Sequence, residues 1–176
     1  NAHYAATQMH LESQEWPSFQ NDSTDDFLSW VKAHVLNGSP VAIGIYMNQF
    51  RFYRNTQPTA GDPQYDHIVP VTGIGSNYPL TPTYHADDLI YFSYNGLWGE
   101  SYTPLYRFSY RFNTFQGTRQ QANSKQGPIY SVPNEGHNYG IAILGVFDRD
   151  HDTIRVRLET SPNFEFPNIL NGSNKR

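Results

Sequence analysis

The chain has 176 residues, a length that fits one domain, and its formal net charge of −4 includes only 12 Lys and Arg residues. This balance argues against the basic face with which proteins bind the phosphates of nucleic acids. The 3 Trp, 13 Tyr and 11 Phe residues supply apolar surface for a core, whereas the absence of Cys excludes disulfides, zinc–thiolate sites and a thiol nucleophile within these residues. The longest apolar stretch, 139–147, is far shorter than the roughly 20 residues of a membrane helix.

Two helices are predicted near the N-terminus. Residues 2–11 carry small and apolar side chains that can form a short helix. In the second helix, Ser23 or Thr24 is the expected N-cap, and apolar residues recur at helical spacing over 27–35. This helix is predicted to end before Pro40, which cannot continue it.

Strand-like runs dominate the rest of the chain, and stretches rich in Pro, Gly, Asn and Asp separate them. The predicted strands are residues 41–46, 68–74, 89–94, 105–112, 129–132, 139–147 and 154–158. The main loops are expected at 55–65, 76–87 and 116–128. Helices followed by many antiparallel-looking strands predict an α+β fold, in a single domain over residues 1–176.

One histidine and one asparagine are candidate catalytic residues. His67 opens a β-branched strand that runs into a Gly-rich turn, and an imidazole anchored in this way can act as a general base. Asn95 follows a later strand, and its amide oxygen can accept the imidazole N–H while Trp98 shields that bond from water. The alternative role is structural, because His and Asn at strand ends commonly form turns and hydrogen bonds.

These two segments resemble a known family. Residues 66–75, Asp-His-Ile-Val-Pro-Val-Thr-Gly-Ile-Gly, resemble the histidine strand of the papain-like cysteine peptidases. Residues 95–102, Asn-Gly-Leu-Trp-Gly-Glu-Ser-Tyr, are similar to the block that carries their catalytic asparagine. The helix that ends in Asn-Gly-Ser-Pro at 37–40, followed by strand 41–46, is similar to a segment of the bacteriocin-leader peptidases. The resemblance covers residues 24–148.

The resemblance implies a papain-like α+β domain, with one or two N-terminal helices and a mainly antiparallel sheet or half-barrel. It implies that His67 is the base and Asn95 orients it, with Asp66 and Trp98 in supporting positions. In this family the nucleophile is a Cys at the head of a helix upstream of the histidine, and this chain has no Cys. The hydroxyl residues considered in its place also lie outside the Gly-rich setting of a nucleophile; they are Thr7, Ser13, Ser18, Ser23 and Thr24. The domain is therefore expected to be incomplete at its N-terminus and inactive by itself.

Three interpretations of function follow. In the first, the protein is a Cys-less pseudoenzyme that serves as a self-assembling structural or binding module. In the second, it is the heavy chain of a thiol peptidase whose Cys lies on an upstream, cleaved segment. The third is a carbohydrate-binding module, given the many aromatic side chains. For the first two, the expected partner is another copy or the cleaved segment, because a missing helix would leave an apolar sheet face. Surfaces rich in Tyr, Phe, Asn and Gln also suit an extracellular filament.

Two acidic segments are compared with metal sites. Residues 148–152 have the Asp spacing of a calcium loop, but Thr153 stands where Gly is needed, so a hairpin turn is predicted. His85, Asp87 and Asp88 have side chains that can ligate a metal, but Asp87 and Asp88 are interpreted as the start of a strand at the edge of a loop. No metal or cofactor is therefore predicted.

Three Asn-x-Ser sequons are candidate N-glycosylation sites, at Asn21, Asn37 and Asn171, and Pro40 weakens the second. The first residues include neither Met nor an apolar signal-like stretch, and the chain ends in a dibasic pair. These features together predict an extracellular glycoprotein, secreted or on the cell surface, that is cut from a precursor.

Overall fold

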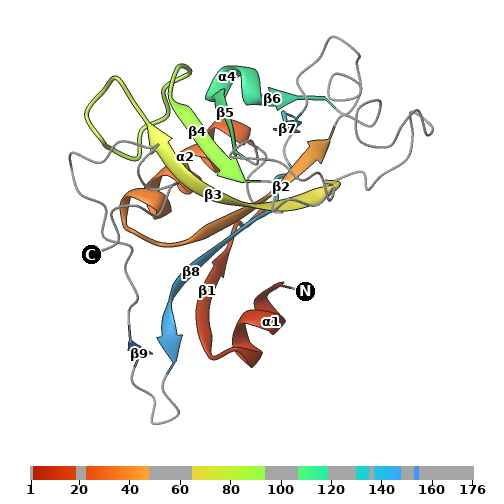
Figure 1. The fold of residues 1–176 in the computed structure, drawn as a ribbon, viewed down its shortest axis with the longest axis vertical. Helices are drawn as coiled ribbons and strands as arrows, with labels where there is room; N and C mark the ends of the chain where they lie inside the picture. Colours follow the sequence, from red (N-terminus) through yellow and green to blue (C-terminus); the bar gives the residue numbers. More distant parts are fainter. Residues whose placement is uncertain are drawn as a thin grey trace.

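A computed structural model describes residues 2–18, 23–47, 65–93, 107–118, 130–134, 137–147 and 153–154 (Figure 1). Within them the chain has the predicted α+β class, with a mainly antiparallel, open sheet and few helices. The helices are α1 (Ala2–Gln8), α2 (Thr24–Leu36) and α4 (Phe112–Phe115). The strands are β1 (Leu11–Glu15), β2 (Val41–Met47), β3 (His67–Gly75), β4 (Leu89–Ser93), β5 (Arg107–Arg111), β6 (Gln116–Gly117), β7 (Tyr130–Pro133), β8 (Gly140–Phe147) and β9 (Thr153–Ile154).

The sheet runs in the order β1-β8-β2-β3-β4-β5, so a strand from near the end of the described chain lies between two early ones. Strand β2 pairs antiparallel with β3 on one side and with β8 on the other. The pair formed by β6 and β7 is parallel. The central position of β2 fixes the place of its neighbour β3, which begins at His67.

Helices α2 and α4 close the core on one face of the sheet. Ile43, Ile45 and Met47 of β2 point into this core and are at most 1% exposed, because alternate side chains of a strand point to the same face. Aromatic rings fill much of the space, as the composition predicts. The buried core cluster consists of Phe27, Leu28, Val31, Val41, Ile43, Ile45, Met47, Val69, Ile90, Phe92, Phe112, Phe115, Tyr130, Val132 and Ala142.

Helix α2 begins and ends where the sequence predicts. Ser23 is the N-cap, and its Oγ accepts a hydrogen bond from the Asp26 N–H at 3.1 Å. At the other end Gly38 has a φ of 77°, a conformation that glycine adopts without strain. Thr24, the alternative N-cap, is instead buried, and its hydroxyl donates to the Pro133 carbonyl at 2.7 Å. The start of α2 is thereby tied to β7.

The first predicted helix is too long. The helix expected over 2–11 ends at Gln8, and Leu11 begins β1 instead. His10 has a φ of 57°, which stops the helical backbone and turns the chain into the strand. Strand β1 forms because β8 supplies its hydrogen-bond partners, with Leu11 opposite Val146.

Two later predictions also need correction. The strand expected over 105–112 ends at Arg111 in the structure, because Phe112 begins the single turn α4 that carries two Phe side chains into the core. Within the loop expected over 116–128, residues Gln116–Gly117 form β6 by pairing with β7. Of the strand predicted over 154–158, residues 155–158 lie outside the described residues.

Tyrosine rings partly cover the other face of the sheet at β2, which points away from α2. A Cβ added at Gly44 would lie 2.9 Å from Cγ of Tyr65, so the Tyr65 ring rests directly on this glycine. The ring of Tyr139 extends the cover, with its centroid 5.1 Å from that of Tyr65. Ile68 lies opposite Gly44 in the β2–β3 register and remains 37% exposed. Among the described residues, Ile68 is therefore an exposed apolar side chain on this face of the sheet.

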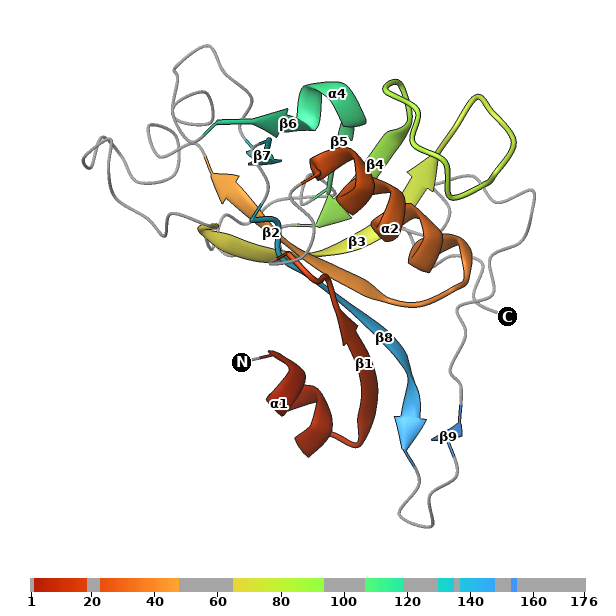
Figure 2. The same cartoon turned by 180° about the vertical axis from the view of Figure 1, so that it is seen from behind.

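Strand β1, the outer part of β8 and helix α1 extend away from the rest of the sheet (Figures 1 and 2). Residue His3 holds α1 against β1: its backbone N–H donates to Glu15 Oε1 at 3.3 Å, and its Nδ1 lies 3.0 Å from Ser13 Oγ. In both views α1 lies at the opposite end of the molecule from the yellow-green loop between β3 and β4.

Candidate functional site

The structure describes His67 and Asp66 at the start of β3. His67 is opposite Ile45 in the β2–β3 register, and opposite residues of an antiparallel pair share a face. Because Ile45 is fully buried, the half-buried His67 lies on the side of the sheet that faces the core. The Asp66 carboxylate accepts a hydrogen bond from the Met47 N–H at 2.9 Å, and the Asp66 N–H donates to the Ile45 carbonyl at 2.9 Å. Asp66 therefore continues the pairing of β2 with β3.

Several predicted site residues cannot be placed beside them. Asn95 and Trp98 lie outside the described residues, and so do the sequons at Asn21 and Asn171. Asn37 is exposed at the C-terminal cap of α2, where its backbone N–H donates to an α2 carbonyl. Of the predicted catalytic and supporting residues, the structure therefore describes Asp66 and His67, which are neighbours in sequence.

A surface serine–histidine contact does not form a catalytic triad. The hydroxyl of Ser13 and the imidazole of His3 are 3.0 Å apart. In a triad a carboxylate orients the imidazole through its second nitrogen. Here Glu15 accepts from the backbone N–H of His3 instead, so the contact attaches α1 to β1.

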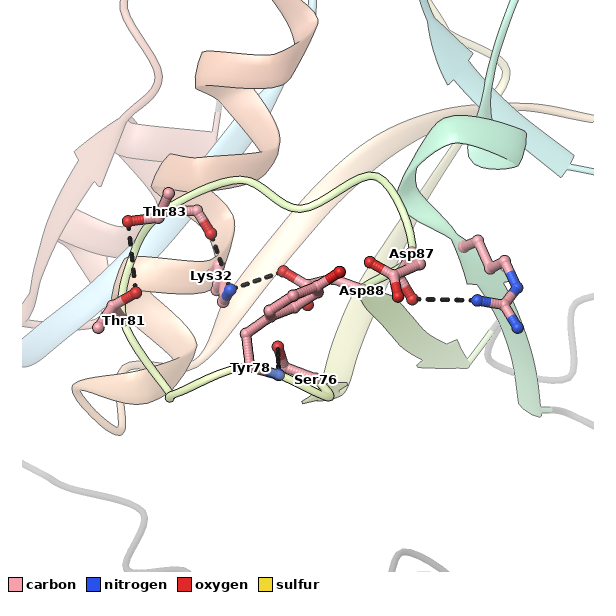
Figure 3. Close-up of polar contacts among 8 residues, drawn as sticks. Lys32, Ser76, Tyr78, Thr81, Thr83, Asp87 and Asp88 are labelled. Carbon is pink, nitrogen blue, oxygen red and sulfur yellow. Dashed lines mark hydrogen bonds and ion pairs between the residues drawn. The ribbon is translucent and has the colours of Figure 1, made fainter.

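A buried ion pair lies at the base of the loop between β3 and β4. Nζ of Lys32, from α2, is 2.6 Å from Oδ2 of Asp88, and both side chains are 0% exposed. Figure 3 shows Lys32 also pointing to the loop backbone, where its Nζ donates to the Thr83 carbonyl at 2.8 Å. Asp88 directly precedes β4, close to the strand start that the sequence predicts. Its role as the counter-ion of Lys32 is not predicted by the sequence. The available signal was Lys32 itself, one turn after the buried Leu28 on the apolar stripe of α2.

The loop above this ion pair is held by its own hydrogen bonds (Figure 3). The Tyr78 N–H donates to Ser76 Oγ at 3.1 Å, and the Thr81 hydroxyl donates to that of Thr83 at 3.3 Å. The ring of Tyr78 stacks on His85, with centroids 3.9 Å apart and planes inclined by 20°. The loop therefore presents Tyr78 in a defined position, with one face of its ring against the imidazole.

A polar cluster links this loop to α2 and β6. Nε2 of Gln116 donates to Asp25 Oδ1 at 2.7 Å and to the Tyr84 hydroxyl at 3.0 Å. Burial and the negative charge and hydrogen bond of Asp25 raise the pKa of Tyr84 to about 12. The phenol is therefore neutral at physiological pH and acts as a hydrogen-bonding group.

Among the residues that the structure covers, no three His, Asp or Glu side chains gather as a metal site. No helix in that part of the chain is both long and apolar enough to cross a membrane. Comparison with known proteins finds no matching family model, no matching curated protein and no matching solved structure. The resemblance to papain-like peptidases therefore rests on the sequence motifs alone.

Proposed function

We propose that this protein is a non-catalytic, papain-like domain of a secreted protein and that it serves as a self-assembling structural or binding module. The observation that carries this proposal is a grouping of exposed apolar side chains. Tyr4, Met9, Ile68, Tyr78 and Leu80 are between 37% and 66% exposed. Tyr4 and Met9 lie on and just after α1, and Tyr78 and Leu80 lie in the β3–β4 loop. Single exposed hydrophobic residues are ordinary, whereas groups of them mark contact surfaces.

The non-catalytic part of the proposal follows from the chemistry of the candidate pair. A general base needs a nucleophile to activate, and the 176 residues contain no thiol. The Asp66 carboxylate is engaged with the Met47 N–H, a contact that joins two strands. This contact supports a structural role for Asp66 just before β3.

Sedimentation velocity of the purified chain over a wide concentration range tests self-association. We expect species larger than the monomer, with a fraction that rises with concentration. A monomer at every concentration would contradict the proposal.

Denaturing mass spectrometry of the protein purified from its natural source tests whether a peptide with a catalytic Cys accompanies the chain. We expect a single chain that a thiol-reactive probe does not label. A copurifying peptide that carries a reactive Cys, with labelling that His67→Ala abolishes, would instead establish the heavy chain of a thiol peptidase.

Secretion and glycosylation belong to the same proposal. Expression in eukaryotic cells with a secretory leader is expected to yield a product whose mass falls after glycosidase treatment. Asn21→Gln and Asn171→Gln are each expected to reduce that fall, whereas Asn37→Gln is the matched control with a sequon weakened by Pro40. An unchanged mass after glycosidase treatment of the parent chain would exclude N-glycans.

A further inference from the structure

We propose that the outer edge of strand β5 binds an extended, acidic segment of another protein, which adds to the sheet as a further strand. The inference goes beyond the proposed self-association, because the partner is a different chain. It rests on the backbone groups that β5 presents and on the two arginines beside them.

Strand β5 stands at one end of the sheet order, and among the described residues it pairs with β4 alone. The Phe112 N–H donates to the Asp88 carbonyl at 2.8 Å, so these two residues form a hydrogen-bonded pair of the ladder. Such pairs alternate in an antiparallel ladder, so Tyr110 and Phe108 exchange the next bonds with β4. The N–H and the carbonyl of Ser109 therefore point away from β4. An edge with outward backbone groups is a template for pairing with an extended chain.

The two sides of β5 differ in character. Phe108 and Tyr110 are half-buried and pack against the core cluster. Arg107, Ser109 and Arg111 are the alternate residues of the strand and so take the opposite face of the sheet. Of these, Ser109 and Arg111 are exposed. A strand added at this edge would have one side beside the aromatic residues and one side beside the arginines.

The arginines favour an acidic partner. The β4 residues opposite this face of β5 are Leu89, Tyr91 and Ser93, which carry no charge. The Arg111 guanidinium donates to the Asp87 carbonyl at 3.5 Å, a bond that uses one of its several N–H donors. Opposite charges on neighbouring strands stabilise their pairing. Carboxylates are therefore favoured where an added strand passes the two arginines.

A second copy of β5 is a poorer occupant of the same edge. Two copies of β5 paired antiparallel about Ser109 would place Arg107 of each copy opposite Arg111 of the other. Like charges directly opposite each other destabilise a strand pair, and charged residues on edge strands keep identical edges apart. The charge of this edge therefore selects a different, acidic chain.

The register defines the pattern of the partner. The matching segment is as long as β5, which has 5 residues. Its first and last residues are acidic and lie beside the arginines, and its second and fourth residues are apolar and lie beside Phe108 and Tyr110. Its central residue exchanges backbone hydrogen bonds with Ser109. The ligand class is an extended peptide in which acidic and apolar residues alternate around a polar centre.

Fluorescence anisotropy with labelled probe peptides tests this assignment on the full chain. The acidic probe is Thr-Glu-Val-Thr-Val-Glu-Thr with both termini blocked, and it has the same sequence in both directions. The matched probe replaces both Glu residues by Lys. We expect saturable binding of the acidic probe and binding of the basic probe that is weaker by about tenfold, because two attractive charge pairs become repulsive.

Ser109→Pro tests the role of the backbone edge. Proline removes the outward N–H, and edge strands accept proline where the N–H faces away from the neighbouring strand. We expect this variant to unfold at the temperature of the parent chain and to lose binding of the acidic probe. Ser109→Ala keeps the N–H and is the matched control, with binding like that of the parent chain.

The double variant Arg107→Glu with Arg111→Glu tests the role of charge. It is expected to bind the basic probe more tightly than the acidic probe, the reverse of the parent chain. This reversal also shows that the variant is folded. If Ser109→Pro did not fold, the presence or absence of the reversal would decide the inference.

Three results would overturn the inference: no binding of the acidic probe to the parent chain, equal binding of the two probes, or parent-like binding by a folded Ser109→Pro. Loss of self-association in a folded Ser109→Pro, measured by sedimentation velocity, would assign the edge to a second copy and would also overturn it. A parent chain that binds the acidic probe but stays monomeric would contradict the proposed self-association and leave this inference standing.

Discussion

Lys32 and Asp88 form an ion pair in which Nζ and Oδ2 are 2.6 Å apart and both side chains are fully buried. Among the described residues, the other carboxylate oxygen of Asp88 has no hydrogen-bond partner. The charge of Asp88 is therefore compensated mainly by Lys32. The pair joins α2 to the end of the β3–β4 loop and so determines where that loop lies.

Replacement of one member of this pair is expected to destabilise the protein strongly. Lys32→Met leaves the Asp88 charge buried without compensation, and we expect the free energy of unfolding to fall by about 3–5 kcal/mol. Urea unfolding measures this change. The double variant Lys32→Met with Asp88→Leu removes both charges and is the control, with an expected loss much smaller than that of the single variant. Equal losses in the two variants would contradict the role of the ion pair.

Gly140 is expected to tolerate no side chain. A Cβ at this position would lie 2.9 Å from Cε2 of Phe27 and 2.9 Å from Cζ3 of Trp30. Gly140→Ala is therefore expected to lower the free energy of unfolding by about 1–3 kcal/mol through overpacking. The comparison is Gly75→Ala, where the nearest atom is 3.2 Å away on the half-buried Tyr91 ring, so a smaller loss is expected. Thermal unfolding of both variants decides whether the aromatic rings beside Gly140 can move aside.

The N-cap of α2 gives a third prediction. Ser23→Ala removes the acceptor of the Asp26 N–H and is expected to cost about 1 kcal/mol of stability. Ser23→Asp restores an acceptor and places a negative charge at the helix N-terminus, so its stability is expected to match that of the parent chain. If Ser23→Asp were as unstable as Ser23→Ala, the hydrogen bond would not be the cause.

The raised pKa of Tyr84 predicts a pH dependence. The pKa rises from 10.0 to about 12 on folding, so the folded protein holds the phenol proton more tightly than the unfolded chain does. The stability that this contributes is fully present below pH 10.0 and is lost as the pH rises from there towards about 12. Titration of phenolate absorbance in the parent chain and in Tyr84→Phe isolates this group. Asp25→Asn removes the negative charge but keeps an oxygen that can accept a hydrogen bond, and is expected to lower the pKa of Tyr84; an unchanged pKa would exclude the charge of Asp25 as a cause.

Local sequence signals were sufficient to predict helix α2 and the long apolar strands. Ser23 and Gly38 mark the two ends of α2 by chemistry that acts over a few residues, so the boundaries could be predicted. Strand β1 could not, because its sequence, Leu-Glu-Ser-Gln-Glu, is mostly polar and becomes a strand through pairing with β8. The turn α4 was missed for a similar reason, since its two Phe side chains are drawn into a core built by distant strands.

The candidate site was also predictable in part from the sequence and in part only from the tertiary structure. The sequence singled out Asp66 and His67 from their position before a β-branched run, and β3 does begin at His67. Which way His67 faces depended on its pairing with Ile45, because a shift of one residue in register would turn it to the other face. The interpretation of His67 as the base, with Asp66 in a supporting position, stays a prediction from the resemblance.

By itself, the sequence determined the α+β class, the course of α2, the aromatic character of the core and the lack of a thiol, because these follow from composition and from short-range spacing. Only the tertiary structure decided that Lys32 is buried against Asp88, that Tyr65 covers Gly44, and that helix α1 and the β3–β4 loop lie at opposite ends of the molecule. These relationships join residues far apart in the chain. They depend on strand order and register, which no local pattern of residues specifies.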